Sequence, residues 1–344
     1  MCYNEGPMAP IESLHTHTTL SDGKLTYREL FELAQTLGIS IFAYTDHDAV
    51  PPPEVMAELE TFRGRETKWI IGVEMTADLP KELVPASATM HIIGLFVDPT
   101  NEALRNHCHL AQEARIRRMK KIVENLQALG YKITDEDCFE MSGGESVGRP
   151  HIVRALAKYP ENNLVTERIR KEMASDLDPE VQTRYNHMME RGETQYPYVL
   201  FLSPTAYRKG YVEHDYMPDL DEAVKLIRDA GGVAIVAHYH TIRTKMPLEV
   251  FDKLLQEKRI DGAEVVYGLR EYGTDGEKAI LEEKARLREI IERNGALALG
   301  GSDAHTEEDL QNYVMNDWFS SETIGFTEKV LATGRVNKAF SSLE

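Results

Sequence analysis

The feature that most constrains the fold is an alternation of short apolar segments with longer helical patterns. Seven short segments are apolar and most of them contain β-branched residues, which is typical of strands. They occupy residues 11–14, 41–45, 69–75, 91–97, 233–237, 262–266 and 296–300. Helical patterns accompany the last three, at residues 220–230, 248–257 and 276–293. The alternation predicts an α/β fold with parallel strands covered by helices. Seven such strands suit a barrel.

A long interval between the fourth and fifth strands shows almost no strand signal. It begins with apolar residues at helical spacing from Ile116 to Leu129, and Gly130 is a typical helix end. Further helices are predicted at residues 149–158, 164–173 and 179–191. The interval is too long for a simple loop. We therefore predict the first part of the barrel at residues 1–97, a mainly helical insertion that selects the substrate at 98–231, and the second part of the barrel at 232–344.

The charge of the chain limits its partners. The 344 residues include 57 acidic and 39 basic side chains, a formal net charge of −18. This argues against broad binding to nucleic acid or to an anionic membrane, since both need clustered Lys and Arg. No apolar stretch approaches the roughly 18 residues of a membrane span, no signal-peptide pattern is present, and the three cysteines form no CxxC pair. We expect a cytoplasmic protein without a stable DNA partner or a membrane, and the oligomeric state stays open.

Side chains that can ligate metals accompany almost every predicted strand. They are His15, His17 and Asp22 after the first, His47 and Asp48 after the second, Glu74 in the third, His91 at the start of the fourth, His238 after the fifth, and Asp303 and His305 after the seventh. The carboxyl ends of parallel barrel strands meet at the edge where active sites form. A single His-x-His pair is a weak signal, because alternate strand residues share a face in any case. Repetition on five strands predicts a site.

These residue types favour a particular chemistry. Imidazoles and carboxylates together suit zinc, iron or manganese. Even the nine of these side chains other than Asp48 exceed what one ion can use, so two or three divalent ions are expected. Closely spaced ions deprotonate a bound water and hold both the attacking and the leaving oxygens of a phosphoryl transfer. The set therefore favours hydrolysis of a phosphate ester.

The motifs HTHTTLSDG, YTDHD, GVE, HIIGLF, AH and GSDAH resemble those of the PHP (polymerase and histidinol phosphatase) superfamily of metal-dependent phosphoesterases. The resemblance covers about residues 10–97 and 230–305. It implies a distorted seven-stranded (β/α)7 TIM-like barrel, with a helical insertion here, and a trinuclear metal centre. It assigns His15, His17, Glu74 and Asp303 to one metal, Glu74 as a bridge with His91 and His238 to a second, and Asp22, His47 and His305 to a third.

Two positions depart from the family pattern. Ser13 stands where the family usually has Asp, which affects a hydrogen bond behind the ligands and not a ligand. The sequence AHYH stands where AHP is common, so Tyr239 and His240 either reshape the pocket or leave His240 as a surface residue.

The insertion contains a second motif, GGESVGRPHIVRAL at residues 143–156. Glycines precede a predicted helix that begins near Arg149, Pro150 and His151, and free backbone N–H groups with an arginine make an anion site. The alternative is an ordinary helix start with Arg149 in solvent. Similar GRPHI-type helices and KGYV segments (residues 209–212 here) occur in the branch that resembles nucleoside 3',5'-bisphosphate phosphatases and small exoribonucleases. That likeness implies that Arg149 and His151 bind substrate phosphate.

Other tempting residues point less clearly to a site. His107 and His109 of the HCH sequence cannot share one helical face at a spacing of two. Arg117 and Arg118 belong to a basic helix face, which is either solvated or directed at a phosphate. Glu264 is either a carboxylate behind the ligands or a buried strand end.

The sequence thus predicts a hydrolase acting on phosphoric ester bonds, a phosphatase or phosphodiesterase. Metal-bound hydroxide would attack phosphorus, and Asp48 or His305 would act as the acid or orient it. The preferred substrate is a small phosphorylated molecule, a nucleotide of the 3',5'-bisphosphate or monophosphate type. A cyclic phosphodiester or histidinol phosphate is the enzymatic alternative. A metal-containing, nucleotide-binding regulatory domain is the non-enzymatic one. Metal-dependent C–N hydrolysis would usually need a bridging lysine, which no strand end supplies.

Overall fold

The computed structural model describes residues 11–84, 89–142, 147–191, 209–243, 245–266, 277–316 and 322–343. The chain divides into two compact units, the first drawn from residues 1–109 and 217–344 and the second from 110–216. The helix α3 (Glu102–Ala128) begins in the first unit and ends in the second. No helix among the described residues combines the length and apolar character needed to cross a bilayer.

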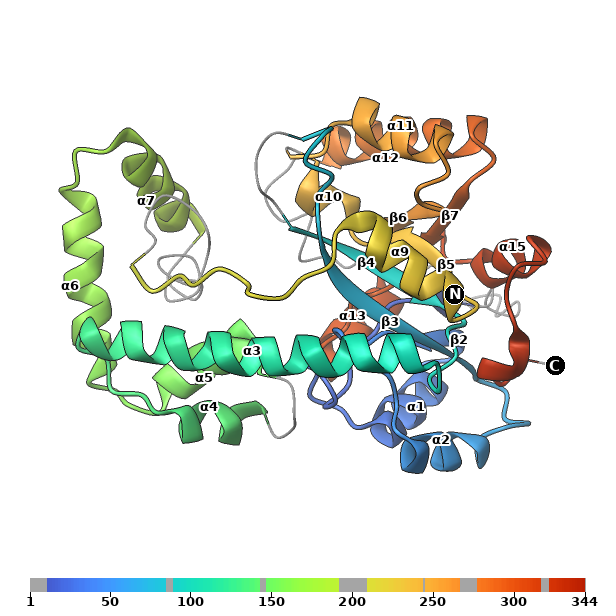
Figure 1. Cartoon of the computed structure of the whole chain (residues 1–344), viewed down its shortest axis with the longest axis horizontal. Coiled ribbons are helices and arrows are strands. Elements are labelled where there is room, and N and C mark those ends of the chain that lie inside the picture. The colour runs from blue at the N-terminus through green and yellow to red at the C-terminus, as the bar shows by residue number, and fades with distance from the viewer. Residues whose placement is uncertain are drawn as a thin grey trace, which may run out of the picture. The chain divides into compact units, whose positions relative to one another are not determined.

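The first unit is built on one sheet of seven strands (Figure 1). The strands are β1 (Ile11–Ser13), β2 (Ile39–Tyr44), β3 (Lys68–Asp78), β4 (Thr89–Leu95), β5 (Val233–Val236), β6 (Gly262–Val266) and β7 (Leu297–Gly300). Each lies where the sequence predicts a strand. They neighbour one another in chain order, and four of the six pairs are parallel. The fold is α/β with a mostly parallel sheet, as predicted.

The prediction of parallel strands is wrong for β4, which runs antiparallel to both β3 and β5. Only residues 79–88 join β3 to β4. A parallel pair needs a crossover of about a dozen residues or more, whereas a shorter link reverses the chain. The reversal explains why His91 is at the start of its strand: the start of β4 lies at the edge where the parallel strands end.

Helices pack against the strands; in the view of Figure 1, α1 and α2 lie below the strands and α11 and α12 above them. Among the described residues, the helices of the first unit are α1 (Tyr27–Thr36), α2 (Pro53–Glu60), α9 (Leu220–Asp229), α10 (Tyr239–Ile242), α11 (Leu248–Gln256), α12 (Glu277–Arg293), α13 (Glu307–Met315), α15 (Phe326–Ala332) and the 3-10 helix η3 (Lys338–Phe340). The sequence fixes several starts locally. Thr26 and Glu29 cap the start of α1 reciprocally, as Asp219 and Glu222 do for α9.

The two outer strands of this order also meet. The Leu14 N–H donates to the Gly300 carbonyl at 3.0 Å, and Thr16 forms a parallel bridge with Ala304. The segments after β1 and β7 are therefore hydrogen-bonded side by side, and both carry predicted ligands.

The regular structure in the described part of the second unit is helical. After α3 come α4 (Asp135–Ser142), α5 (Arg149–Ala157), α6 (Asn162–Ala174) and α7 (Pro179–Arg191). The helices predicted in this interval agree with α5, α6 and α7 within two residues. Gly130 follows α3 with φ +92°, a conformation that favours glycine. The unit has its own core, in which Met119, Ile122, Val123 and Leu126 of the predicted apolar stripe are buried.

Candidate metal centre

Glu74, on β3, lies at the middle of the predicted ligands. Its carboxylate is buried and has five imidazoles around it. The Oε2 atom lies 2.9 Å from His47 Nδ1, 3.2 Å from His17 Nε2 and 3.3 Å from His15 Nε2. The Oε1 atom lies 2.9 Å from His91 Nδ1 and 3.1 Å from His238 Nε2. Four strand ends or loops of the first unit thus deliver five histidines to one carboxylate.

The remaining predicted ligands adjoin this cluster. Asp303 Oδ1 lies 3.1 Å from His17 Nε2 and 3.5 Å from His15 Nε2. Asp22 Oδ1 lies 3.2 Å from His305 Nε2 and 3.9 Å from His17 Nδ1. The structure therefore brings all nine predicted metal ligands together.

Three sets of these side chains have donor atoms close enough to hold an ion. They are the Asp22 group (His17, Asp22, His47 and His305), the Asp303 group (His15, His17 and Asp303) and the Glu74 group (His47, Glu74 and His91). His17 and His47 each occur in two groups, which the family resemblance does not imply. His238 belongs to none of the three groups, but its Nε2 atom lies 3.1 Å from Glu74 Oε1.

The donor set fits divalent ions on independent grounds. Asp22 Oδ1, His47 Nδ1 and Glu74 Oε2 are buried polar atoms without a hydrogen-bond partner among the described residues. Such atoms are costly unless something satisfies them. His15 Nε2 and His17 Nε2 lie 3.1 Å apart, so both ring nitrogens can reach the same ion. The site is therefore built to bind divalent metal ions.

The electrostatics of the cluster point the same way. Burial alone would lower the pKa of His17, but Asp303 and Glu74 outweigh it and raise the pKa to about 10. Burial also opposes protonation of His238, yet Glu74 and Asp303 raise its pKa to about 9. For Glu74, burial would raise the pKa, but His47, His15 and His91 hold it well below its usual range. Without metal, His17 and His238 retain protons, and bound ions would replace them.

Close packing fixes the segments that carry the ligands. A Cβ on Gly301 would lie 2.4 Å from His15 N, so the segment after β7 can approach β1 only with glycine there. Asp48, His238 and Asp303 have φ of +45°, +28° and +50°. Positive φ at a non-glycine residue costs about 1–3 kcal/mol and clusters at functional sites.

Asp46 holds the first ligand loop. Its carboxylate accepts hydrogen bonds from the Thr18 N–H at 2.7 Å, the Thr18 hydroxyl at 2.8 Å, the Ser21 hydroxyl at 2.6 Å and the Tyr27 hydroxyl at 2.9 Å. This network fixes the residues between His17 and Asp22. Asp46 therefore acts on the loop and is fully satisfied without a metal.

The sequence analysis did not predict two hydroxyl contacts that help to position the ligands. Ser13 Oγ accepts from the Ser302 N–H at 3.0 Å, so the serine that replaces the family aspartate still ties β1 to the last ligand segment. Thr241 Oγ1 lies 2.9 Å from His238 Nδ1. The signal in the sequence is a threonine three residues after a histidine at a helix start.

The two residues predicted as acid differ in exposure. Asp48 is buried; its carboxylate accepts from the Thr76 N–H at 3.1 Å and the Thr76 hydroxyl at 3.3 Å, and lies 3.5 Å from His107 Nε2. The His305 side chain, 19% exposed, borders both Asp22 and Asp303. Of the HCH sequence, His107 is buried against Asp48 while His109 is exposed, so the two do not form a pair.

The residues predicted to bind phosphate lie in the second unit. Arg149 is the first residue of α5, and His151 is buried in its first turn. His151 Nδ1 accepts the Gly148 N–H at 2.9 Å, so this imidazole caps the helix start. Arg118 donates from Nε to the Val212 carbonyl at 2.7 Å.

The AHYH sequence is internal. Tyr239 is buried and its hydroxyl donates to the Met246 carbonyl at 2.8 Å. His240 is buried beside Arg243 and Glu283, so the interpretation of His240 as a surface residue is wrong. The short helix α10 turns its side chain inward.

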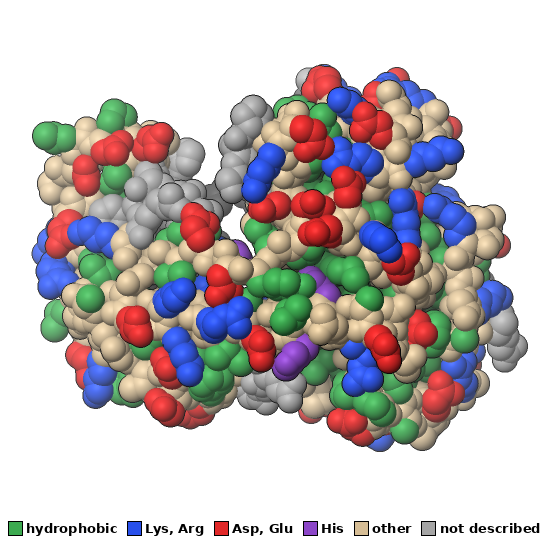
Figure 2. Space-filling model, viewed as in Figure 1, with side chains coloured by type: hydrophobic (Ala, Val, Ile, Leu, Met, Phe, Trp, Pro, Cys, Tyr) green, Lys and Arg blue, Asp and Glu red, His purple; other side chains and the backbone are tan. Residues whose placement is uncertain are grey.

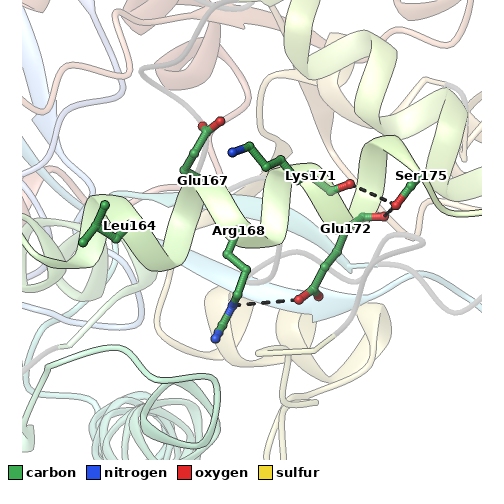
Figure 3. A pocket seen from close by; sticks show the side chains of 6 residues that line it. All are labelled: Leu164, Glu167, Arg168, Lys171, Glu172 and Ser175. Atoms are coloured by element: carbon green, nitrogen blue, oxygen red, sulfur yellow. Dashed lines mark hydrogen bonds and ion pairs between the residues drawn. The ribbon is translucent and has the colours of Figure 1, made fainter.

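A hollow of about 470 Å³ lies on α6 in the second unit and contains none of the predicted site residues (Figure 3). One helix lines it, with Leu164, Glu167, Arg168, Lys171, Glu172 and Ser175. Its charged side chains pair locally, as Arg168 with Glu172 at 3.8 Å. We therefore place the candidate functional site at the metal cluster and not at this hollow.

The fold and the site define a metal-binding α/β protein. The family model of the PHP domain matches residues 13–240, so this chain belongs to the PHP family. A 3',5'-nucleoside bisphosphate phosphatase of Chromobacterium violaceum is 27% identical, covering 87% of this chain and 88% of the relative. The 5'-3' exoribonuclease Rnm of Salmonella typhimurium is 26% identical, covering 67% and 66%.

Two further similarities extend over most of the chain. A phosphoribosyl 1,2-cyclic phosphate 1,2-diphosphodiesterase of Eggerthella lenta is 23% identical, covering 86% of this chain and 94% of the relative. A crystal structure of a candidate metal-dependent phosphoesterase from Bifidobacterium adolescentis has a TM-score of 0.63 at 26% identity. It covers 87% of this chain and 89% of that one.

Proposed function

We propose that the protein is a metal-dependent phosphoesterase that hydrolyses a phosphate ester of a nucleotide. It is a hydrolase of phosphoric ester bonds. The observation that carries the proposal is the surroundings of Glu74, where five imidazoles lie within 3.3 Å of one buried carboxylate in a PHP-family chain. The names of the relatives, which include a phosphatase, an exoribonuclease and a diphosphodiesterase, support the same reaction class.

The centre would hold two or three divalent ions of zinc, manganese or iron. We assign them the nine ligands His15, His17, Asp22, His47, Glu74, His91, His238, Asp303 and His305. When bound, such ions lower the pKa of a coordinated water and neutralise charge on phosphoryl oxygens. Glu74 is the shared ligand, because both of its oxygens face imidazoles.

The chain's own residues divide the remaining tasks. Asp48 is held by Thr76 and buried, so it orients the loop that carries His47. His305 is the more open of the two, and as one of the nine ligands it has no proton of its own to give, so we assign it the orientation of a water that protonates the leaving oxygen. Its Nδ1 lies 2.9 Å from the Asp303 carbonyl, which fixes the ring.

We assign substrate phosphate to Arg149, with His151 holding the helix start behind it. An arginine at the first position of a helix stands beside backbone N–H groups that attract anions. The bisphosphate phosphatase named above supports a nucleotide as the substrate. Acidic and basic side chains are interspersed on the face drawn in Figure 2. Together with the formal net charge of −18, this favours a small phosphorylated molecule over a long polynucleotide.

A cyclic phosphodiester is the second candidate substrate, and one observation favours it. The Eggerthella lenta relative named for such a substrate aligns over 94% of its own length. Histidinol phosphate has no comparable support. We also propose that the sheet closes into a seven-stranded TIM-like barrel, since Leu14 and Gly300 are hydrogen-bonded where closure would join β1 to β7.

The test is hydrolysis of a panel of esters by manganese-loaded and zinc-loaded protein, followed as phosphate release from monoesters and as formation of the monoester or nucleotide product from diesters. The panel contains adenosine 3',5'-bisphosphate, AMP, histidinol phosphate, a cyclic phosphodiester with its product monoester, and a short RNA. We expect adenosine 3',5'-bisphosphate or a monophosphate to exceed the others, and H17A to abolish release. If every ester is inert under both metals, the proposal is wrong and a binding role replaces it.

A further inference from the structure

Glu264, on β6, is a buried carboxylate to which the proposed chemistry gives no task. Its side chain is 1% exposed. Both carboxylate oxygens lie 3.2 Å from His15 Nδ1. The Oε2 atom also accepts the backbone N–H of His238 at 2.7 Å. One carboxylate thus contacts two predicted metal ligands that are far apart in the sequence.

The contact with His15 fixes which ring nitrogen carries the proton. An ionised carboxylate only accepts hydrogen bonds, so Nδ1 must donate to Glu264. The lone pair of a neutral ring is then on Nε2, which faces Glu74 Oε2 at 3.3 Å and Asp303 Oδ1 at 3.5 Å. The carboxylate also makes the imidazole a better ligand.

The contact with His238 acts on the backbone. His238 has φ +28°, a conformation that side-chain-bearing residues rarely adopt. The hydrogen bond from its N–H to Glu264 holds the chain there, at the turn from β5 into α10. In that conformation His238 Nε2 lies 3.1 Å from Glu74 Oε1.

We propose that Glu264 is a positioning residue that holds His15 and His238 in metal-binding geometry at the same time. This inference rests on the proposed function only in needing a metal centre, not in needing any particular ester. The hydrogen bonds and ion pairs that the structure gives Glu264 join it to His15 and His238, and none of them reaches the Asp22 group. Loss of Glu264 should therefore weaken part of the centre and spare the rest.

Two variants separate the two contacts. E264A removes both acceptors and leaves the His15 tautomer free. E264Q keeps the size of the side chain and can still accept from His238, but it lacks the negative charge facing His15 Nδ1. The matched control is D261N, three residues earlier, because Asp261 is also buried and accepts a backbone N–H, that of Ala234 at 2.8 Å.

The measurements are metal content by mass spectrometry after dialysis, manganese and zinc affinity by competition with a chelator, and unfolding of the metal-free protein. For E264A we expect metal affinity to fall by about 10–100-fold, the usual effect of removing a carboxylate behind a ligating histidine. Fewer ions should remain per chain. E264Q should lie between E264A and wild type, and D261N should keep wild-type affinity. Wild-type affinity in E264Q and E264A would overturn the inference. If E264A does not fold, E264Q decides alone.

Failure of this inference can be told apart from failure of the proposed function. If wild-type protein hydrolyses no ester but E264Q binds metal more weakly, the function is wrong and the role of Glu264 stands. If wild-type protein hydrolyses an ester and E264Q matches it in metal affinity and in rate at limiting metal, the role of Glu264 is wrong. A loss of rate in E264Q that excess metal restores supports both.

Discussion

The residue just before β6 and the residue at the middle of β6 are of the same kind but have different partners. Asp261 and Glu264 are both buried carboxylates, and each accepts a backbone N–H from the β5 region, of Ala234 at 2.8 Å and of His238 at 2.7 Å. Asp261 is also bound by Arg228 at 2.8 Å and by Arg335 at 2.6 Å. Glu264 faces an imidazole instead.

The partners decide what each carboxylate can do. Guanidinium groups keep their charge at every accessible pH, so Asp261 stays paired for as long as its own carboxylate is ionised, and the cluster serves the fold. Imidazoles can release their protons and bind metal ions in their place. The carboxylates at the other edge of the sheet are paired with imidazoles, so metal ions can replace the protons there. One edge of the sheet is therefore structural, because arginines pair its carboxylate, and the other edge can bind metal, because histidines pair its carboxylates. The following predictions test that separation.

The largest effect is expected from E74Q. The substitution removes the charge that five imidazoles share, and with it the ligand common to the proposed ions. We expect metal affinity to drop and the rate of hydrolysis to fall by about 1000-fold or more, since ions at such centres supply several kcal/mol of stabilisation to the transition state. Metal content and initial rates at saturating metal measure both. H109A, which alters an exposed histidine, is the matched control and should retain both. Full metal content in E74Q would contradict the assignment.

The substitution D261N should affect stability and leave the centre alone. It removes the charge that binds Arg228 and Arg335, and hydrogen bonds to charged groups contribute about 1.5–3 kcal/mol each when well buried. Both arginines are substantially exposed, so we expect a loss of about 2 kcal/mol, measured by urea unfolding of the metal-loaded protein. The rate per folded molecule should not change.

The acid side of the unfolding curve gives an independent check on Asp261. Burial would raise the pKa of Asp261, but hydrogen bonds from Arg228, the Ala234 N–H and Arg335 outweigh it and lower the pKa. Its contribution to stability is therefore present above the ordinary value of 3.8 and lost as the pH falls below it. D261N should flatten this part of the curve. An unchanged acid limb would show that another carboxylate dominates.

The histidines of the metal-binding edge should lose their contribution to the stability of the metal-free fold as the pH rises, whereas Asp261 loses its contribution as the pH falls. The raised pKa of His17, about 10, stabilises the metal-free fold below the ordinary value of 6.5, and this is lost as the pH rises through about 10. Metal binding must displace these protons and that of His238, whose pKa is about 9. We expect affinity to rise by about one to two powers of ten per pH unit from about pH 6 to about pH 9. Chelator competition across that range measures the slope. A flat profile would mean that the imidazoles are neutral before metal binds.

The sequence alone predicts the strands and the ligand types, because both depend on local patterns. Strand ends are marked by apolar runs, and His15, Glu74 and Asp303 follow from their place beside them. The orientation of β4 could not be predicted in this way, since it depends on the length of the connection between β3 and β4. That length depends on where β3 ends and β4 begins, which the sequence pattern does not define closely enough. The two contacts of Glu264 could not be predicted either. They depend on the register of β5, β6 and β1, which brings together residues from distant parts of the chain.

By the same reasoning, the ion pair of an exposed carboxylate should contribute little to the free energy of unfolding. Lys253 near the end of α11 and Glu257 just after the helix form an ion pair of 3.8 Å, with side chains 52% and 43% exposed. Water screens such a pair, and ordering two long side chains offsets its gain, so K253A should change the free energy of unfolding by no more than about 0.5 kcal/mol. Urea unfolding beside D261N measures the contrast under one set of conditions. A loss as large as that of D261N would mean that burial is not what gives Asp261 its effect, and the contrast between the two kinds of carboxylate would then rest on the metal-binding edge alone.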